Sequence, residues 1–277
     1  MASDSPQTEK LSPVKAARAC DKARLRFSKG GNLRFVSHRD LMKCFERILR
    51  RAELPVHQSQ GFHPMPRMVF AMSLGLGILG TSEVLELEFD EPMEPAELQR
   101  RLEAQMPRGL VILSVRRIAV GASARVRRAG YRVAVPPALA RELPARIEEL
   151  LVAKALWVER TRPAPRRLDL RPYLSELRLS DTENGMELEM LLWVTPNGAA
   201  RPDEILGLLH LSELVDSGVP VERHVLELHD EIQDPGPLPE ILASRQLALP
   251  RPEHQREPAE TAARPTALIS GPLSFDS

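Results

Sequence analysis

The chain has 277 residues, of which 43% are hydrophobic and only 4% aromatic, so we expect one large core or two ordinary ones built mainly from aliphatic side chains. Its 38 Lys and Arg residues balance 38 Asp and Glu residues, and its longest apolar stretch, residues 69–79, is interrupted by serine and glycine and is too short to cross a membrane. The amino terminus lacks the cationic and then apolar order of a secretory signal, so we expect a cytoplasmic protein without membrane association.

The two cysteines, Cys20 and Cys44, lie far apart in the sequence and belong to no CxxC pair. This spacing argues against an iron–sulfur cluster, a zinc knuckle and a disulfide scaffold. We therefore expect two ordinary thiols and no cofactor.

The first regular elements are a strand and a helix. Residues 22–27 alternate between cationic and apolar side chains, which predicts a half-buried strand, and Gly30-Gly31 predicts a turn after which the alternation continues to Phe35. A helix is predicted to begin at His38, because Ser37 and Asp40 have the spacing of a capping box. Apolar residues follow one side of this helix, and four cations follow the other: Arg39, Lys43, Arg47 and Arg50.

The remainder of the first domain completes a familiar order of elements. Pro55 ends the helix, and the glycine- and proline-containing segment 58–66 is predicted to be an irregular loop. Strands are then predicted at residues 68–74, 84–89 and 109–118, with a short helix from Pro95. The order strand, helix, strand, strand, helix, strand is the split βαβ or ferredoxin-like plan.

The same order recurs in outline after a basic link that contains Arg125, Arg127 and Arg128. Strands are predicted at residues 131–135, 156–160, 168–180, 186–194 and 221–228, with a hairpin turn at Asn184-Gly185 and helices at residues 143–151 and from Pro202. We therefore predict an α+β fold of two tandem ferredoxin-like domains with a disordered C-terminal tail. The predicted boundaries are a disordered N-terminus at 1–20, domain 1 at 21–122, domain 2 at 123–230 and a proline-rich tail at 231–277.

Positive charge is concentrated in residues 22–67, which hold eleven Lys or Arg residues against three acids. Such a surplus attracts polyanions, because each phosphate that is neutralised releases condensed counterions. A solvated face without function is the alternative. In the ferredoxin-like order Glu86 and Glu88 would pair across the sheet with Arg24 and Arg26, which would leave only the four helix cations for binding.

Two further candidate sites involve histidines. Phe62 and His63 lie in the irregular loop and are predicted to stack on a nucleobase while Arg67 meets phosphate; alternatively, Phe62 fills the core. His38, at the helix start, is a candidate general base toward a ribose 2′-hydroxyl, and the alternative is a capping or surface residue. His57 and His63 lack a third ligand at a suitable spacing, so no metal site is predicted.

Asp169 and Arg171 flank Leu170 and are predicted to lie on the same face of a strand. We interpret them as a structural ion pair at the domain junction.

The segment RFVSHRDLMKCFERILRRAELPVHQSQGFHPMPRMVFAMSLGLG resembles the radical SAM-linked protein family, a bacterial domain of unknown function found fused behind, or encoded beside, radical SAM enzymes. The resemblance spans about residues 22–230 and departs from the family at His63 and Met65, where Asn and His are commoner. It implies a radical SAM enzyme as partner and an association with RNA or the translation machinery. The chain lacks the three-cysteine cluster motif, so it is not itself the radical enzyme. The matching positions are Arg34, Phe35, Ser37, His38, Asp40, Arg50, Arg51, Leu54, Pro55, Ser59, 61–66, Leu74, Gly75, 169–172, Arg201 and Pro202.

Our leading hypothesis is a non-enzymatic accessory protein whose two domains form a basic groove that presents RNA, from tRNA or the ribosome, to a separate radical SAM enzyme. A metal-independent endoribonuclease with His38 as base is one alternative, and a protein-only scaffold is another. The predicted nucleic-acid-binding residues are Arg34, Arg39, Lys43, Arg47, Arg50, Phe62, His63 and Arg67.

Overall fold

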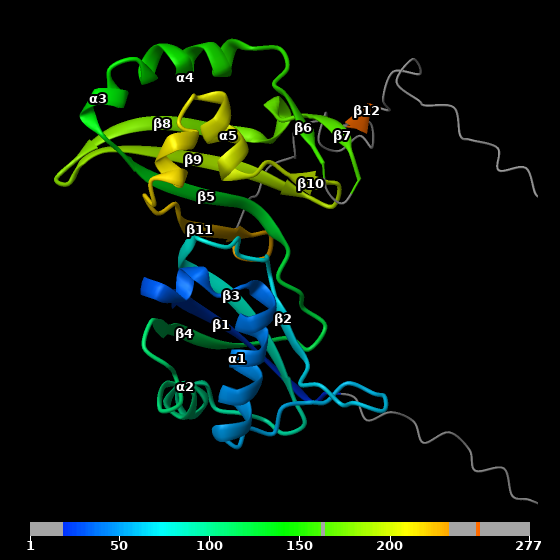
Figure 1. The fold of residues 1–277 in the computed structure, drawn as a ribbon. Coiled ribbons are helices and arrows are strands. Elements are labelled where there is room, and N and C mark those ends of the chain that lie inside the picture. The colour runs from blue at the N-terminus through cyan, green and yellow to red at the C-terminus, as the bar shows by residue number, and fades with distance from the viewer. Residues whose placement is uncertain (1–18, 162–163, 233–247, 250–277) are drawn as a thin grey trace, which may run out of the picture.

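The computed structural model describes residues 19–161, 164–232 and 248–249. Strands in which apolar and polar residues alternate form one nine-stranded mixed sheet (Figure 1). The strands are β1 (Asp21–Lys29), β2 (Met68–Phe70), β3 (Leu79–Phe89), β4 (Leu110–Ile118), β5 (Val126–Val135), β6 (Trp157–Arg160), β7 (Arg166–Asp169), β8 (Leu174–Thr182), β9 (Gly185–Thr195), β10 (Gly198–Ala199), β11 (Glu222–Leu228) and β12 (Ala248–Leu249). The helices are α1 (His38–Arg51), α2 (Pro95–Glu103), α3 (Pro137–Ala140), α4 (Leu143–Val152), α5 (Pro202–Leu208) and α6 (Ser212–Asp216), with short 3-10 helices η1 (Gly31–Phe35) and η2 (Arg171–Tyr173). The protein thus has a mixed α+β fold that is rich in strands.

The first half of the sheet has the strand order β2–β3–β1–β4, and all three pairings are antiparallel. Leu25 of β1 lies opposite Leu85 of β3, and both side chains are fully buried. The apolar sides of α1 and α2 pack on the same core, through residues such as Phe45 and Leu98. The predicted helix starts at His38 and Pro95 are confirmed.

The second half has the strand order β8–β9–β5–β11, again with antiparallel pairings. Thr182 pairs with Gly185, so the predicted hairpin turn at Asn184-Gly185 is confirmed. Helices α4, α5 and α6 share one core with these strands. Strands β6 and β7 leave this sheet and form a separate small one with β12.

Strand β11 joins the two halves, and it lies between them in Figure 1. It pairs with β5 on one side and runs parallel to β3 on the other, where Arg223 lies opposite Gly80. The Arg223 guanidinium is 1% exposed and forms an ion pair with Glu83, which is 3% exposed. It also donates to the Ser73 carbonyl oxygen at 3.0 Å. The sheet is therefore continuous across the boundary between the halves.

A second contact joins the residues that follow β11 to the first half. The buried guanidinium of Arg24 donates from Nη2 to Glu86 Oε1 at 2.8 Å and to Asp230 Oδ2 at 2.7 Å. Its Nη1 donates to Glu231 Oε1 at 3.1 Å. One cation of β1 is thus shared by a carboxylate from β3 and two from the end of the second half.

Asp230 should make stability sensitive to acid. The hydrogen bond from Arg24 holds the pKa of Asp230 below its ordinary value of 3.8, so the folded state binds fewer protons than the unfolded state as that group titrates. Its stabilising effect is present above the ordinary pKa and is lost as the pH falls through the folded-state pKa. Asp230→Asn should lower the free energy of unfolding at pH 7 by about 1 kcal/mol, because water around the partly exposed Asp230 carboxylate screens its interaction with Arg24.

The measurement is urea unfolding of both proteins between about pH 3 and pH 7. The difference between wild type and Asp230→Asn should shrink as the pH falls below about 4. A difference that stays constant over this range would mean that Asp230 is not stabilised by its charge.

Several predictions about local structure are wrong. The Gly30-Gly31 turn leads into η1 and not into more strand, so Phe35 is left exposed. Arg127 and Arg128 belong to β5 and not to a basic link. The predicted strand at 156–160 is confirmed as β6, although it lies in the small sheet. The N-terminal segment 1–18 and most of the predicted disordered tail lie outside the described residues, whereas Ala248–Leu249 pair with β7.

Asp169 and Arg171 do not form the predicted ion pair. Oδ1 of Asp169 accepts the backbone N–H groups of Leu156 at 2.7 Å and Arg171 at 2.9 Å. The Arg171 guanidinium donates to the Leu151 carbonyl oxygen at 2.8 Å. The chain turns into η2 here, so the two side chains no longer lie on one strand face.

Candidate nucleic-acid interface

Helix α1 presents a cationic face because its apolar face is committed to the core. Asp40 N donates to Ser37 Oγ at 3.2 Å and caps the helix start, as the sequence predicts. Leu41, Phe45 and Ile48 are buried. The cations on the remaining surface are all exposed: Arg39, Lys43, Arg47, Arg50 and Arg51.

These five helix cations have no carboxylate within 4.0 Å among the residues that the structure describes. The cations of β1 behave differently, since Arg24 pairs with Glu86 as predicted and Arg26 pairs with Glu231, not with Glu88. Acids therefore neutralise the sheet cations and leave those of the helix open to solvent. We call the surface of these five residues the helix cation face.

The loop between α1 and β2 is an ordered projection (Figure 1). Its two arms pair, because Ser59 N donates to the Met65 carbonyl oxygen at 2.8 Å and Met65 N donates to Ser59 Oγ at 3.0 Å. Gly61 at the tip has φ +142°, a conformation that side chains disfavour. Phe62 is 101% exposed, so the alternative in which it fills the core is wrong. His63 beside it is exposed as well.

The base of this loop is fixed to the edge of β3. Arg67 N donates to the His57 carbonyl oxygen at 2.7 Å, and His57 N donates to the Glu88 carbonyl oxygen at 2.8 Å. The buried His57 ring contacts Asp90, with Nδ1 and Oδ1 2.5 Å apart. The described residues contain no group of three or more His, Cys, Asp or Glu side chains that could hold a metal ion.

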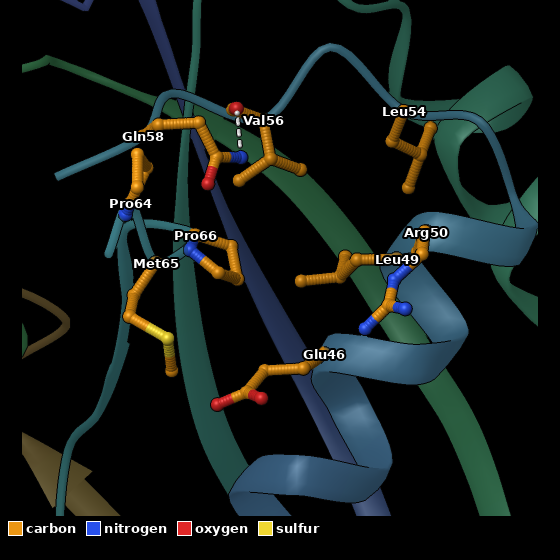
Figure 2. A pocket seen from close by; sticks show the side chains of 9 residues that line it. All are labelled: Glu46, Leu49, Arg50, Leu54, Val56, Gln58, Pro64, Met65 and Pro66. Carbon is orange, nitrogen blue, oxygen red and sulfur yellow. Dashed lines mark hydrogen bonds between the residues drawn. The ribbon is translucent and has the colours of Figure 1, made fainter. Parts of the chain in front are cut away.

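A pocket of about 420 Å³ separates α1 from the loop (Figure 2). Glu46 and Arg50 project from the helix toward it, and Met65 and Pro66 face them from the loop. The complete lining is Glu46, Leu49, Arg50, Leu54, Val56, Gln58, Pro64, Met65 and Pro66. The fold therefore brings Arg50 of the helix cation face next to the loop that carries Phe62 and His63.

Two predicted binding residues are already engaged. Arg67 is exposed, but its Nε lies 3.9 Å from Glu88 Oε2. Arg34 in η1 donates to the Gly218 carbonyl oxygen of the second half at 3.4 Å, and its guanidinium carbon lies 4.6 Å from the centroid of the Phe35 ring. Arg34 thus contributes to contact between the halves and lies apart from the pocket.

His38, the candidate general base, is half-buried against Phe70, with ring centroids 5.1 Å apart. Its Nδ1 is buried and has no hydrogen-bond partner among the described residues. Burial, followed by the charges of Arg223 and Lys29, lowers the pKa of His38. The ring is therefore neutral near pH 7 and packs at the edge of the core. Its role as a general base stays a prediction.

Of the nine residues that line the pocket, sequence reasoning predicted only Arg50 as a binding residue. It also omitted Arg51 from the cation face. Glu46 stands one helical turn before Arg50, and this i, i+4 spacing was the one available signal. The position of Gln58 opposite the helix depends on the path of the loop, which local pattern does not encode.

The protein has an α+β fold, and its surface combines the exposed helix cation face with an ordered loop that carries Phe62 at its tip. The chain belongs to the family described as “Uncharacterized protein conserved in bacteria (DUF2344)”, whose model matches residues 22–202. This confirms the expected bacterial domain of unknown function. None of the described helices is long and apolar enough to span a membrane.

No curated protein matches the chain. Among solved structures, one described as an unknown protein from Galdieria sulphuraria is similar to it, with 15% identity and a TM-score of 0.24. That match covers 75% of this chain and 98% of the other chain. The likeness is too weak to support an inference about fold or function.

Proposed function

We propose that this chain is an accessory protein that binds single-stranded RNA through the helix cation face and the adjoining loop, and that it presents this RNA to a separate radical SAM enzyme. The radical SAM partner, and a tRNA or ribosome-linked source for the RNA, rest on the motif resemblance. RNA binding rests on the observation that the five exposed helix cations lack carboxylate partners among the described residues.

The arrangement of cations and aromatic side chains suits a flexible polyanion. Lys43 and Arg47 lie one helical turn apart, so they offer successive phosphates a row of charge. Phe62 stands at the loop tip with its ring in solvent, where a nucleobase can stack on it without displacing core residues. Arg50, on the next turn of the helix, lines the pocket that separates α1 from the loop.

We interpret each half as a ferredoxin-like unit. The supporting observation is that both halves share one strand order, β2–β3–β1–β4 and β8–β9–β5–β11, with helices as crossovers. RNA-binding units of this plan often use the open sheet face, where aromatic residues stack on bases. Here Asp230 and Glu231 cover Arg24 on the sheet, so we assign the RNA to α1 and the loop instead.

The test is the salt dependence of affinity for a labelled single-stranded RNA, measured by fluorescence anisotropy between about 50 and 200 mM salt. Lys43→Glu combined with Arg47→Glu should reduce the slope of log affinity against log salt by about 1.4, since each lost phosphate contact contributes about 0.7 on a single strand.

The matched control is Arg141→Glu combined with Lys154→Glu, two exposed cations of the second half that have no ion pair among the described residues. It changes the net charge equally and should leave the slope near that of the wild type. Wild-type protein that does not retain RNA, or a control pair that flattens the slope as much as the helix pair, would refute the proposal.

A further inference from the structure

The pocket between α1 and the loop is lined by both apolar and polar side chains. Leu49 and Val56 are buried in its floor, and Met65 and Pro66 close it on the loop side (Figure 2). Its volume of about 420 Å³ falls within the range of pockets that enclose small organic ligands. A flat group with polar atoms at its edge suits such a space.

The polar side chains of this pocket offer acceptors, on Glu46 and Gln58, beside the donors of Arg50. The half-buried Glu46 carboxylate has no hydrogen bond or ion pair among the described residues, although it lies one turn from Arg50. Gln58 uses Nε2 to donate to the Val56 carbonyl oxygen at 2.9 Å, so its Oε1 is left as an acceptor. Figure 2 shows this bond, and Oε1 points away from it toward the pocket.

A ligand that satisfies both oxygens of the Glu46 carboxylate supplies two adjacent donors. The Watson–Crick edge of guanine carries two neighbouring donors, N1–H and the N2 amino group, which match the two oxygens of one carboxylate. Adenine and cytosine offer one amino donor beside an acceptor, and uracil offers one N–H between two carbonyl oxygens that a carboxylate repels. Arg50 supplies positive charge for the phosphate or for O6 of the same nucleotide.

We propose that the pocket binds an unpaired guanine of the RNA, with Glu46 as the residue that determines specificity. This inference rests on the proposed function and specifies its ligand. Phe62 and the helix cation face hold the strand, and the Glu46 carboxylate accepts both donors of the base.

The experiment uses the full chain and short labelled oligouridylates that differ only in one central nucleotide, which is guanosine, inosine, adenosine or cytidine. Anisotropy titrations should give about tenfold tighter binding of the guanosine oligomer than of the adenosine and cytidine oligomers, as expected for a bidentate contact. Inosine keeps N1–H and lacks the amino group, so its oligomer should bind with intermediate affinity.

Glu46→Gln should abolish the preference for guanosine and leave the salt slope unchanged, because a neutral amide presents one acceptor and one donor. Glu53→Gln removes a nearby exposed negative charge outside the pocket and should retain the preference. Thermal unfolding of each variant verifies that it folds. Salt-dependent binding without base preference, or a preference that survives in Glu46→Gln, overturns the guanine assignment alone, whereas absence of any RNA binding overturns the proposed function.

Discussion

Replacing Glu83 by glutamine should destabilise the protein by about 3–5 kcal/mol, because it leaves the buried Arg223 guanidinium without a countercharge. Lys29 adds to this effect, since it is fully buried and its Nζ donates to the Val36 carbonyl oxygen. Burial lowers the pKa of Lys29 below its ordinary value, and the negative charge of Glu83 opposes this shift. The Glu83 carboxylate thus stabilises two buried cations, Arg223 and Lys29, at the junction of β3 and β11.

The measurement is urea unfolding, read as the shift in midpoint at constant slope. Glu97→Gln is the matched control, because Glu97 accepts hydrogen bonds from Arg100 and Arg101 on the surface of α2. This substitution should leave the midpoint unchanged. An unchanged midpoint for Glu83→Gln would show that the junction does not depend on this ion pair.

Replacing Arg24 by methionine should also cost about 3 kcal/mol, because methionine fills the space but leaves the buried Glu86 with Lys22 as its one remaining cation. Asp230 and Glu231 would lose the contacts from Arg24 that tie them to β1. The pKa of Asp230 should return toward its ordinary value, since the hydrogen bond from Arg24 is the main cause of its depression.

Urea unfolding again gives the change in free energy, and the pH dependence of that value reports on Asp230. Arg178→Met is the control, because the exposed guanidinium of Arg178 lies 3.6 Å from Glu176 and such surface pairs add little. Equal stability of Arg24→Met and the wild type would mean that the remaining side chains compensate for the missing charge.

Both clusters bear on the RNA proposal. Cations of the sheet pair with the nearby acids. Arg223 pairs with Glu83, and Arg24 pairs with Glu86 and with Asp230 and Glu231 after β11. The chain has equal numbers of acidic and basic residues, so carboxylates that pair inside the sheet are not available to α1. The helix cation face is thus a consequence of where the acids lie, and net charge alone does not reveal it.

Local sequence determined several helix starts and one hairpin of this protein. Ser37 and Asp40 define the start of α1, Pro95 and Pro202 begin helices, and Asn184-Gly185 forms a hairpin, because each depends on atoms only a few residues apart. The cationic and apolar sides of α1 also follow from its sequence, since helical periodicity alone separates them.

Tertiary structure alone decided how these elements meet. Three arrangements in the fold join residues that are distant in sequence or separated by an irregular loop. Arg223 pairs with Glu83, Asp230 pairs with Arg24, and Gln58 lies opposite Glu46 across the pocket. Such contacts depend on sheet register and on the path of the loop, because no local periodicity specifies them. The sequence by itself therefore determined the cationic helix. Only the packed fold decided which charges lack a partner among the described residues and placed a pocket beside them.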